Sequence, residues 1–379
     1  MKILVTGAHG FIGKNLIKRL RNEGYGDICE YVRENTEEDL KGYCDEADFV
    51  FHLAGINRPR NEEEFRTGNT DLTKRLMSYL EEAGNNCPVI ISSSTQAESP
   101  DPGNIYGLSK QKAEEAVYRH GLRTGAPVLI YRMPNVFGKW SRPDYNSAVA
   151  TFCHNVARDL PITVNDPEHE MRLVYIDDVV SEFIDDLSAI TGGESVEGLW
   201  QEHTGLRCPI YETKLGHIAE VIQSFPEMRE SLNVPQLSDP LVSKLYSTYL
   251  SFLPEDAFSY KLKMKTDQRG SFTEFIRTAD RGQVSVNISH PGMIKGQHWH
   301  DSKNEKFLVV QGKGLIRFRR IGDDKVIEYH VTGDELEVVD IPTGYVHCII
   351  NEGDTDMVTL MWASEIFDPA RPDTYRENV

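Results

Sequence analysis

A tyrosine, a lysine and a run of hydroxyl residues have the types and spacing for proton transfer. Tyr106 and Lys110 are four positions apart, so on a helix both side chains project from one face. The ammonium group of Lys110 would stabilise the tyrosinate and lower the pKa of Tyr106 towards the working range of a general acid or base. We predict that Ser94, from the run at residues 92–95, completes this catalytic set, with its immediate neighbours as alternatives. The competing interpretation is a helical surface pair beside a polar turn.

A second group of residues has the types and spacing of metal ligands. His298 and His300 are two positions apart, so on a strand both side chains face the same way. Glu305 and a later histidine, His347, would complete a set of three nitrogens and one oxygen suited to a divalent transition metal. The alternative is that these histidines are only the polar lining of a barrel.

A glycine-rich turn near the start of the chain could hold a diphosphate. Glycines at residues 7, 10 and 13 follow a short apolar run and precede a helical pattern. Without a Cβ atom, the backbone can turn tightly and approach the anion, which the free N–H groups of the next helix then face. A simple turn with three convenient glycines is the alternative. The predicted cofactor-binding residues of this segment are Gly7, His9, Gly10, Phe11, Ile12 and Gly13.

The end of the second predicted strand, near residue 32, bears on the choice of cofactor. An acidic residue at this tip usually holds the ribose 2′-hydroxyl of NAD, whereas an arginine suits the 2′-phosphate of NADP. Arg33 stands at or just past the tip, and Glu30 lies three residues earlier. We therefore predict NADPH with Arg33 in its site; the alternative is that Arg33 is merely solvated.

The elements that must position these residues follow two different patterns. In the first half, short β-branched runs alternate with amphipathic stretches, which is typical of a doubly wound parallel sheet of the Rossmann type. Beyond about residue 254, closely spaced strands are separated by Gly, Asp and Asn, which predicts an antiparallel barrel or jelly roll. We place the two domains at residues 1–250 and 255–379. The predicted strands of the first half are 2–6, 48–53, 89–92 and 128–131, and its helices are 11–23, 71–83 and 106–119. The predicted strands of the second domain are 271–277, 283–289, 306–311, 314–320, 326–331, 335–340, 347–351 and 357–363.

Composition excludes several classes of protein. Of the 379 residues, 39% are hydrophobic, and no apolar run is long enough for a membrane span. The formal net charge is -18, so a nucleic acid is not an expected partner. Six cysteines are scattered without a close pair, which favours reduced thiols in the cytoplasm over a disulfide framework.

The motifs of the first half, taken together, resemble the extended short-chain dehydrogenase/reductase family over about residues 1–240. The resemblance rests on residues 7–13, 52–55 and 132–138, and on the catalytic set described above. It implies a nucleotide-sugar substrate, and it implies that Tyr106 and Lys110 are catalytic. Residues 95–97 are Thr-Gln-Ala where the 4,6-dehydratases of that family carry Asp-Glu, which favours a reductase or an epimerase. The resemblance adds Leu53, Ala54, Gly55, Tyr106, Lys110 and Arg132 to the cofactor site, and Thr95 and Asn135 to the substrate site.

The histidine-rich segments resemble the two motifs of the cupin family. The first is Gly292-x5-His298-x-His300-x4-Glu305-x6-Gly312, and the second runs from Pro342 to Asn351. Gly333 stands nine rather than six residues before Pro342, which suggests a longer strand or a bulge. Residues 267–274 resemble the opening strand of dTDP-4-dehydrorhamnose 3,5-epimerases. That likeness makes Arg269 a candidate contact for a substrate diphosphate and Glu274 a second substrate-binding candidate.

The order of the two domains resembles that of bacterial capsular polysaccharide enzymes of the CapF/WbjC type, over essentially the whole chain. The resemblance implies a homodimer with NADPH and one zinc ion. It also implies a bifunctional enzyme: the cupin inverts carbon 3 of a UDP-4-keto-6-deoxy-HexNAc, and the reductase domain reduces carbon 4. The product would be UDP-2-acetamido-2,6-dideoxy-L-talose, a precursor of N-acetyl-L-fucosamine. The proton-transfer residues of the barrel stay open among His290, Lys303, Lys306, His330 and Tyr345.

Two other functions are compatible with the same sequence. In the first, only the reductase is an enzyme and the cupin is a metal-stabilised dimerisation module. Loss of the metal would then cost stability and dimer formation but spare hydride transfer. In the second, the protein is a non-catalytic sensor of NADP. The intact set of Ser94, Tyr106 and Lys110 speaks against a sensor, which has no use for the acid.

Overall fold

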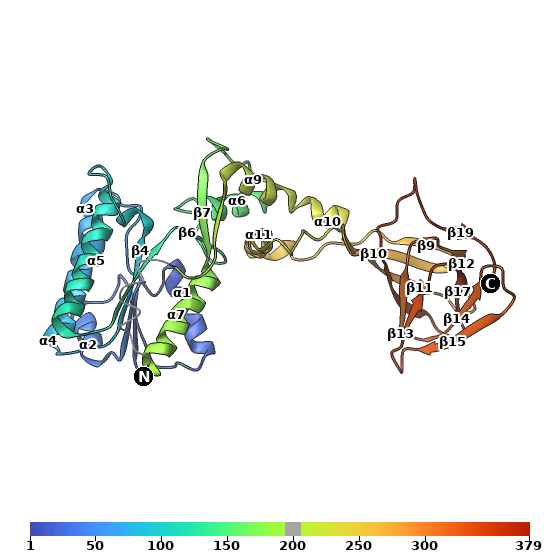
Figure 1. The fold of residues 1–379 in the computed structure, drawn as a ribbon, viewed down its shortest axis with the longest axis horizontal. Coiled ribbons are helices and arrows are strands. Elements are labelled where there is room, and N and C mark those ends of the chain that lie inside the picture. The colour runs from blue at the N-terminus through green and yellow to red at the C-terminus, as the bar shows by residue number, and fades with distance from the viewer. Residues whose placement is uncertain (194–205) are drawn as a thin grey trace. The chain divides into compact units, whose positions relative to one another are not determined.

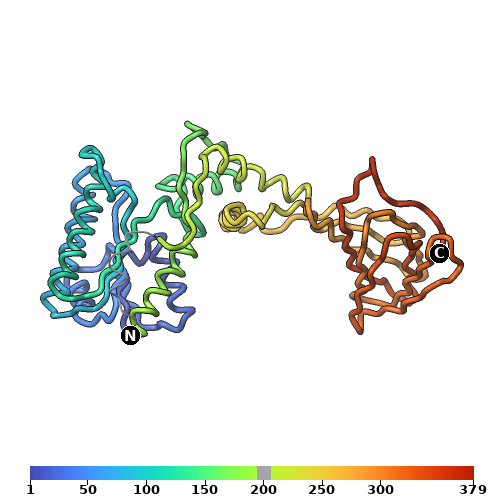
Figure 2. Tube along the Cα trace, viewed as in Figure 1, coloured from blue at the N-terminus to red at the C-terminus, as the bar shows by residue number. Residues whose placement is uncertain are grey.

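The computed structural model describes residues 1–193 and 206–379, which divide into two compact units. The first unit contains residues 1–223 and 244–253, and the second contains residues 224–243 and 254–379. Figure 2 follows the chain through both units. Among the described residues, no helix is long and apolar enough to cross a membrane.

A parallel β-sheet that includes β4 lies at the centre of the first unit (Figure 1). Its strand order is β2-β1-β3-β4-β5. Its neighbouring strands are all parallel. Every residue of β1 and β3 is buried, as expected of a sheet that is covered on both faces. The parallel α/β fold predicted for this part of the chain is confirmed. The strands are β1 (Ile3–Thr6), β2 (Ile28–Tyr31), β3 (Phe49–His52), β4 (Val89–Ser94) and β5 (Val128–Met133).

Helices cover both faces of this sheet because its side chains alternate between two hydrophobic layers. Ile3 and Val5 pack with α1 (Phe11–Asn22) and α7 (Ile176–Thr191) on one face. Leu4 packs with the other layer, which contains α2 (Glu37–Glu46), α4 (Leu72–Glu82) and α5 (Ile105–Thr124). Short helical segments complete the layer: α3 (Glu63–Phe65), the π-helix η1 (Arg66–Asp71) and the 3₁₀-helix η2 (Thr95–Ala97).

A smaller sheet in the first unit was not among the predicted elements. It has the order β6-β7-β8, in which the first pair is parallel and the second antiparallel. Its strands are β6 (Asn135–Phe137), β7 (Glu170–Tyr175) and β8 (Ile210–Lys214). The remaining helices of the described residues are α6 (Ala148–Val156), α9 (Leu215–Ser224), α10 (Glu227–Ser231), α11 (Pro240–Leu250) and η4 (Glu255–Ala257).

The second unit is built from two antiparallel sheets, which confirms the all-β character predicted for it. The sheet orders are β16-β13-β18-β11-β10-β9 and β15-β14-β17-β12-β19. Phe307 and Ile341 of the first sheet share one buried cluster with Ile316, Phe318 and Ile349 of the second, so the two sheets pack face to face. The strands are β9 (Lys265–Asp267), β10 (Gly270–Thr278), β11 (Gly282–Ser289), β12 (Ile294–Trp299), β13 (Glu305–Gln311), β14 (Lys313–Arg320), β15 (Val326–Thr332), β16 (Val338–Ile341), β17 (Tyr345–Asn351), β18 (Met357–Ala363) and β19 (Tyr375–Arg376).

Candidate functional sites

A cavity of about 610 Å³ lies at the carboxyl ends of β1, β3, β4 and β5. Ligands of open α/β sheets bind in the crevice outside the carboxyl ends of the strands, where the strand order reverses. Here the order reverses at β1, whose neighbours are β2 and β3. The predicted site residues that line the cavity are Gly7, His9, Gly10, Phe11, Ile12, Gly13, Leu53, Gly55, Ser94, Thr95, Tyr106, Lys110 and Asn135.

The glycine-rich turn packs too closely for side chains. Gly7 has φ +68°, and a Cβ atom there would lie 2.7 Å from the backbone nitrogen of Ala54. A Cβ atom on Gly13 would lie 2.3 Å from the carbonyl oxygen of Gly7. Gly10 is the N-cap residue of α1, and no side chain caps the helix there. The first N–H groups of the helix are therefore available to an anion in the cavity. The turn is therefore built to bring backbone N–H groups close to an anion.

Replacing Gly13 by alanine is expected to weaken dinucleotide binding at least tenfold and to lower the free energy of unfolding by about 1–3 kcal/mol. The reason is that the new methyl group would overlap two carbonyl oxygens of the turn, those of Gly7 and Ala8. Isothermal titration with NADPH and thermal unfolding measure the two effects. Gly42→Ala is the matched control, because that exposed helical glycine has no heavy atom within 4 Å of a new Cβ atom. If Gly13→Ala binds the cofactor like the Gly42→Ala variant, the turn does not hold the diphosphate.

The predicted catalytic residues meet at one wall of this cavity. Asn104 caps the start of α5 by accepting a hydrogen bond from the Gly107 N–H at 2.9 Å, which places Tyr106 in the first turn of the helix. Lys110 follows one turn later, and its ammonium group donates to the carbonyl oxygen of Ser92 at 3.0 Å. Ser94 ends β4 and hydrogen-bonds to the phenol of Tyr106.

The pKa of Tyr106 differs from the sequence-based expectation. It is raised above its ordinary value because burial of the phenol outweighs the hydrogen bond from Ser94, which lowers it. The lowering predicted from Lys110 does not dominate, because burial of the phenol has the largest effect and the Lys110 ammonium donates to the Ser92 carbonyl. Burial also lowers the pKa of Lys110 to about 8, although the carboxylate of Glu114 opposes this shift. Tyr106 is thus protonated at neutral pH, as a proton donor must be.

The lowered pKa of Lys110 predicts how any reduction at this site depends on pH. Below pH about 8 the side chain carries its positive charge, and above it the charge is lost. Transfer of the Tyr106 proton leaves a phenolate that this charge stabilises, so kcat/KM for reduction is expected to fall about tenfold per pH unit above that value. A pH profile of NADPH oxidation measures this. Lys110→Arg, which keeps its charge, should extend the plateau to higher pH; a flat wild-type profile up to pH about 10 would contradict the assignment.

Three predicted cofactor residues are not at the cavity wall. The guanidinium of Arg132 pairs with the carboxylate of the buried Glu114 at 2.7 Å, which holds Arg132 behind the catalytic wall. The Ser93 hydroxyl donates to the same carboxylate at 2.5 Å. Ala54 contributes its backbone N–H, which donates to the Thr6 hydroxyl at 3.2 Å. Arg33 is exposed in the turn after β2.

The second unit contains a cavity of about 400 Å³ with three of the four predicted metal ligands in its wall. Its other polar walls come from β9 and β10, from Lys295 on β12 and from Lys303 in the following loop. Lys303 is buried, and its ammonium group donates to the Pro372 carbonyl and the Thr374 hydroxyl. Of the five residues left open for proton transfer, it is the one in the described cavity wall. The predicted residues in this wall are Arg269, Glu274, His298, His300 and Glu305.

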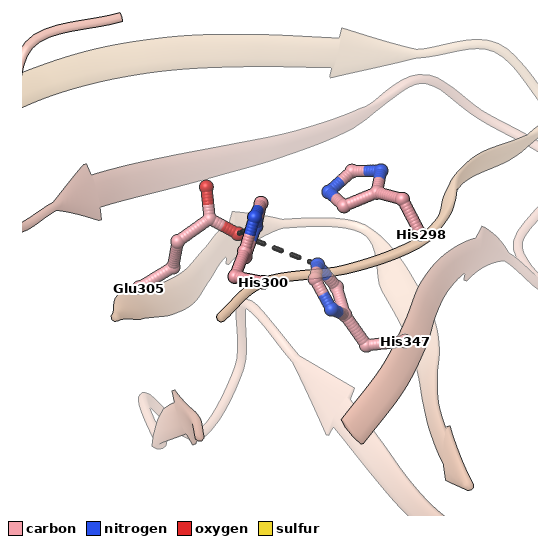
Figure 3. Close-up of side chains that lie close together, drawn as sticks. All are labelled: His298, His300, Glu305 and His347. Carbon is pink, nitrogen blue, oxygen red and sulfur yellow. Dashed lines mark ion pairs between the residues drawn. The ribbon is translucent and has the colours of Figure 1, made fainter. Parts of the chain in front are cut away.

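The four predicted ligands come together within the second unit (Figure 3). One potential ligand atom from each lies within 4.8 Å of every other, and the Glu305 carboxylate is 3.3 Å from both His300 Nε2 and His347 Nε2. These three atoms are buried without a hydrogen-bond partner, which is costly unless something else binds them. Burial lowers the pKa of His298 to about 4, so its ring is neutral at pH 7 and able to bind a cation. The donor set fits a divalent transition metal.

A distortion of β12 aims His298 at this cluster. Gly296 and Gln297 both have positive φ angles, +94° and +60°, and the pairing with β17 shifts register between Gly296 and His298. His298 then pairs directly with His347 across the ladder. Because β12 ends at Trp299, the expected strand alternation does not by itself place His300. The predicted strands omitted β12 because its glycine and polar residues break the β-branched pattern.

Arg269 and Glu274 occupy different surroundings in the second cavity. Arg269 is half-exposed and pairs with Asp267 at 2.6 Å. Glu274 is buried and contacts Arg277, while Lys265 lies 3.5 Å away. Lys295 was not predicted as a site residue. Its ammonium group donates to the Asn287 side chain and to two carbonyl oxygens. Its burial lowers its pKa, and nothing in its local sequence signals that environment.

Comparisons with known proteins match both units. Residues 3–187 match the model of the NAD dependent epimerase/dehydratase family, and residues 265–375 match that of the polysaccharide biosynthesis C-terminal domain. A UDP-2-acetamido-2,6-beta-L-arabino-hexul-4-ose reductase of Pseudomonas aeruginosa is 45% identical over 376 residues, which cover 99% of this chain and 98% of that protein.

Solved structures match the same regions. The crystal structure of the capsular polysaccharide assembling protein CapF from Staphylococcus aureus has 48% sequence identity and a TM-score of 0.91, with 100% of both chains covered. A UDP-glucuronic acid 4-epimerase from Bacillus cereus in complex with NAD has 21% identity and a TM-score of 0.51. It covers 60% of this chain and 84% of its own, so that likeness concerns the fold of the matched part.

Proposed function

This chain belongs to the CapF family of capsular polysaccharide proteins, and on that basis we propose that it is a bifunctional nucleotide-sugar enzyme. Its second unit inverts carbon 3 of a UDP-4-keto-6-deoxy-HexNAc, and its first unit reduces the ketone at carbon 4. The observation that carries the proposal is that one chain holds a Ser–Tyr–Lys set in one cavity and a His–Glu metal cluster in another. The full-length relative named as a hexul-4-ose reductase supports the second step.

In the reduction, the residues of the first cavity orient the substrate and supply a proton. A bound nicotinamide supplies the hydride. Ser94 hydrogen-bonds the oxygen at carbon 4, and the Tyr106 hydroxyl donates its proton to that oxygen as negative charge develops. The buried charge of Lys110 stabilises the resulting phenolate. The water-poor wall on which the three residues lie strengthens each of these interactions.

We propose NADPH rather than NADH as the cofactor. The acidic residue near the tip of β2, Glu30, is engaged by Arg21 at 2.6 Å, and no ion pair to Arg33 is recorded among the described residues. A hollow beside the glycine-rich turn is lined by Lys14, Lys18 and Arg21, among other residues. Positive groups at this end of the site favour the 2′-phosphate of NADPH.

We propose that the second unit is a cupin-type jelly roll with a zinc ion held by His298, His300, Glu305 and His347. The ketone at carbon 4 acidifies the proton at carbon 3, so removal and return of that proton from opposite faces invert the centre. A divalent ion held by these four residues would supply Lewis-acid chemistry at the oxygen of carbon 4. Arg269 at the rim of the cavity is positioned to bind a substrate diphosphate, and Lys295 and Lys303 add positive charge to the walls.

The product of the two steps is proposed to be UDP-2-acetamido-2,6-dideoxy-L-talose, made by a homodimer. The edge strand β15 exposes Val326, Ile327 and Tyr329, and exposed apolar residues on a sheet edge are typical of an interaction surface. In the alternative function, only the reductase is an enzyme, and the metal stabilises the second unit as a dimerisation module. The burial of two of the four residues, His300 and His347, is the observation that favours this alternative.

Proton exchange at carbon 3 tests the proposal. The wild-type protein is incubated with the UDP-4-keto-6-deoxy-HexNAc in deuterated water without NADPH, and the carbon 3 proton is followed by NMR. Exchange without cofactor, followed by formation of the 6-deoxy-talose sugar when NADPH is added, is the expected result. If NADPH is oxidised but the carbon 3 proton does not exchange, only the reductase activity is supported. If neither oxidation nor exchange occurs, the substrate assignment is wrong.

A further inference from the structure

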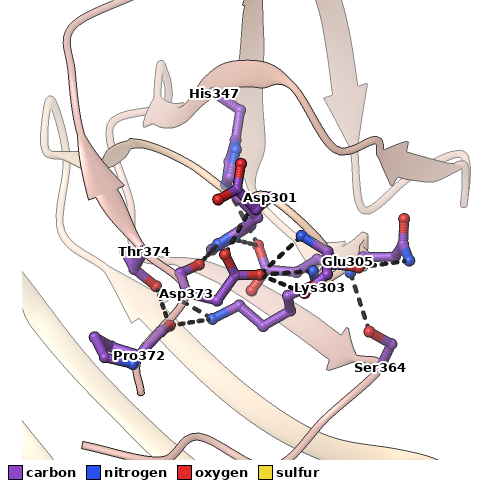
Figure 4. Close-up of polar contacts among 11 residues, drawn as sticks. Asp301, Lys303, Glu305, His347, Ser364, Pro372, Asp373 and Thr374 are labelled. Atoms are coloured by element: carbon purple, nitrogen blue, oxygen red, sulfur yellow. Dashed lines mark hydrogen bonds and ion pairs between the residues drawn. The ribbon is translucent and has the colours of Figure 1, made fainter. Parts of the chain in front are cut away.

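The C-terminal segment of the chain is fastened to the loop that follows β12 (Figure 4). The Asp373 carboxylate accepts hydrogen bonds from three consecutive backbone N–H groups, those of residues 301–303, at 2.8–3.0 Å. The hydroxyl of Ser302 donates to the same carboxylate at 3.0 Å. One side chain thus fixes the whole loop between the metal ligands His300 and Glu305.

The backbone of Asp373 makes a second contact, directly to a predicted metal ligand. Its carbonyl oxygen lies 2.5 Å from Nδ1 of His300. A carbonyl oxygen only accepts hydrogen bonds, so Nδ1 must carry the proton. The other ring nitrogen, Nε2, is then unprotonated in the neutral ring. It is buried without a hydrogen-bond partner and faces Glu305 at 3.3 Å, where a metal ion would use it.

The conformation of Asp373 is held from both sides. Its φ of +39° is uncommon for a residue with a side chain, and such angles persist where surrounding contacts over-determine them. On its C-terminal side, β19 pairs with β12, so that Tyr375 lies opposite Trp299 and their rings stack at 4.7 Å. On the other side, the Pro372 carbonyl accepts a hydrogen bond from Lys303. Contacts on both sides of Asp373 therefore hold its backbone in place.

We infer that Asp373 is a positioning residue of the metal site. Its carboxylate shapes the loop after His300, and its carbonyl selects the His300 tautomer that leaves Nε2 free for the ion. Mutation of a residue that hydrogen-bonds to a metal ligand typically lowers metal affinity 10- to 100-fold. The inference rests on the proposed metal site and adds to it a residue 73 positions from the ligand that it orients.

Asp373→Asn is the variant that separates positioning from simple fastening. Both carboxylate oxygens accept N–H groups, so an amide in this place must turn its NH₂ towards a donor. Asn also tolerates a positive φ, so the backbone angle is not the change being tested. Asp368→Asn is the matched control, because Asp368 lies in the same segment and its carboxylate contacts its own turn, through the N–H of Ala370 at 2.9 Å and the guanidinium of Arg371 at 3.6 Å.

The experiment measures zinc affinity by competition with a chelator and the visible absorption of the Co²⁺-substituted protein. We expect zinc affinity to fall 10- to 100-fold in Asp373→Asn, with an altered Co²⁺ spectrum at saturating metal, and no change in Asp368→Asn. If the apo protein melts at a lower temperature but affinity and spectrum are unchanged, Asp373 only fastens the segment and the inference is wrong. If the wild type itself binds no metal, the proposed metal site fails first.

Discussion

Replacing Tyr106 by phenylalanine is expected to slow reduction of the 4-keto sugar about 10³-fold, within the range that general acid catalysis contributes. The variant removes one hydroxyl and keeps the ring, which packs against Phe65 with centroids 5.6 Å apart. Binding of NADPH and the fold should therefore be preserved, and the loss should be in kcat. Spectrophotometric NADPH oxidation under saturating substrate measures it.

Two controls make this result specific to the proton donor. Tyr118→Phe makes the same chemical change to an exposed tyrosine on the same helix, and it should leave kcat unchanged. Exchange of the carbon 3 proton in deuterated water should also be unchanged in the Tyr106→Phe variant, because that step belongs to the other cavity. A kcat within tenfold of the wild type would mean that another group protonates the alkoxide.

His298→Ala is expected to abolish both zinc binding and exchange at carbon 3. The variant removes one of four ligands, a larger change than loss of an outer partner, which alone costs 10- to 100-fold in affinity. His298 is only partly buried, so its removal leaves a smaller internal void than removal of the fully buried His347. Metal content by elemental analysis and NMR of the exchange reaction measure the two effects.

The reductase provides an internal control for His298→Ala. Reduction of a sugar already inverted at carbon 3 should proceed at the wild-type rate, since the first cavity is untouched. His330→Ala removes an exposed histidine of the same unit, which pairs with Glu352, and should retain metal and exchange. If His298→Ala loses metal yet still exchanges the proton, the ion is only structural and the exchange reaction does not need it.

Local patterns sufficed to predict those side-chain arrangements that depend only on neighbouring residues. The four-residue spacing of Tyr106 and Lys110 implies a shared helical face, and the glycine-rich turn needs only neighbouring residues to form. The direction of the Tyr106 pKa could not be predicted, because burial of the phenol depends on how distant elements pack around it. The partner of Arg132 is Glu114, and nothing in the local pattern of either residue marks that pairing.

In the second unit, spacing predicted which side chains meet but not how. The histidine and glutamate positions follow the spacing predicted for a ligand set, and the structure places the four side chains in one cluster. The bulge at Gly296 and Gln297 escaped prediction because positive φ at a glutamine has no sequence signature. Asp373 escaped prediction for another reason: its role exists only through contacts across 70 or more residues of chain.

The way the chain alternates between its two units has a consequence for how such proteins can be recombined. Residues 224–243 belong to the second unit, yet residues 244–253 belong again to the first. Within the second unit, the backbone of Asn233 bridges that of Arg277 on β10, so the early segment is part of that unit's own architecture. A single gene breakpoint near residue 254 would therefore transfer the rest of the second unit without residues 224–243. Transfer of one unit intact, without dividing the other, requires three breakpoints, after residues 223, 243 and 253.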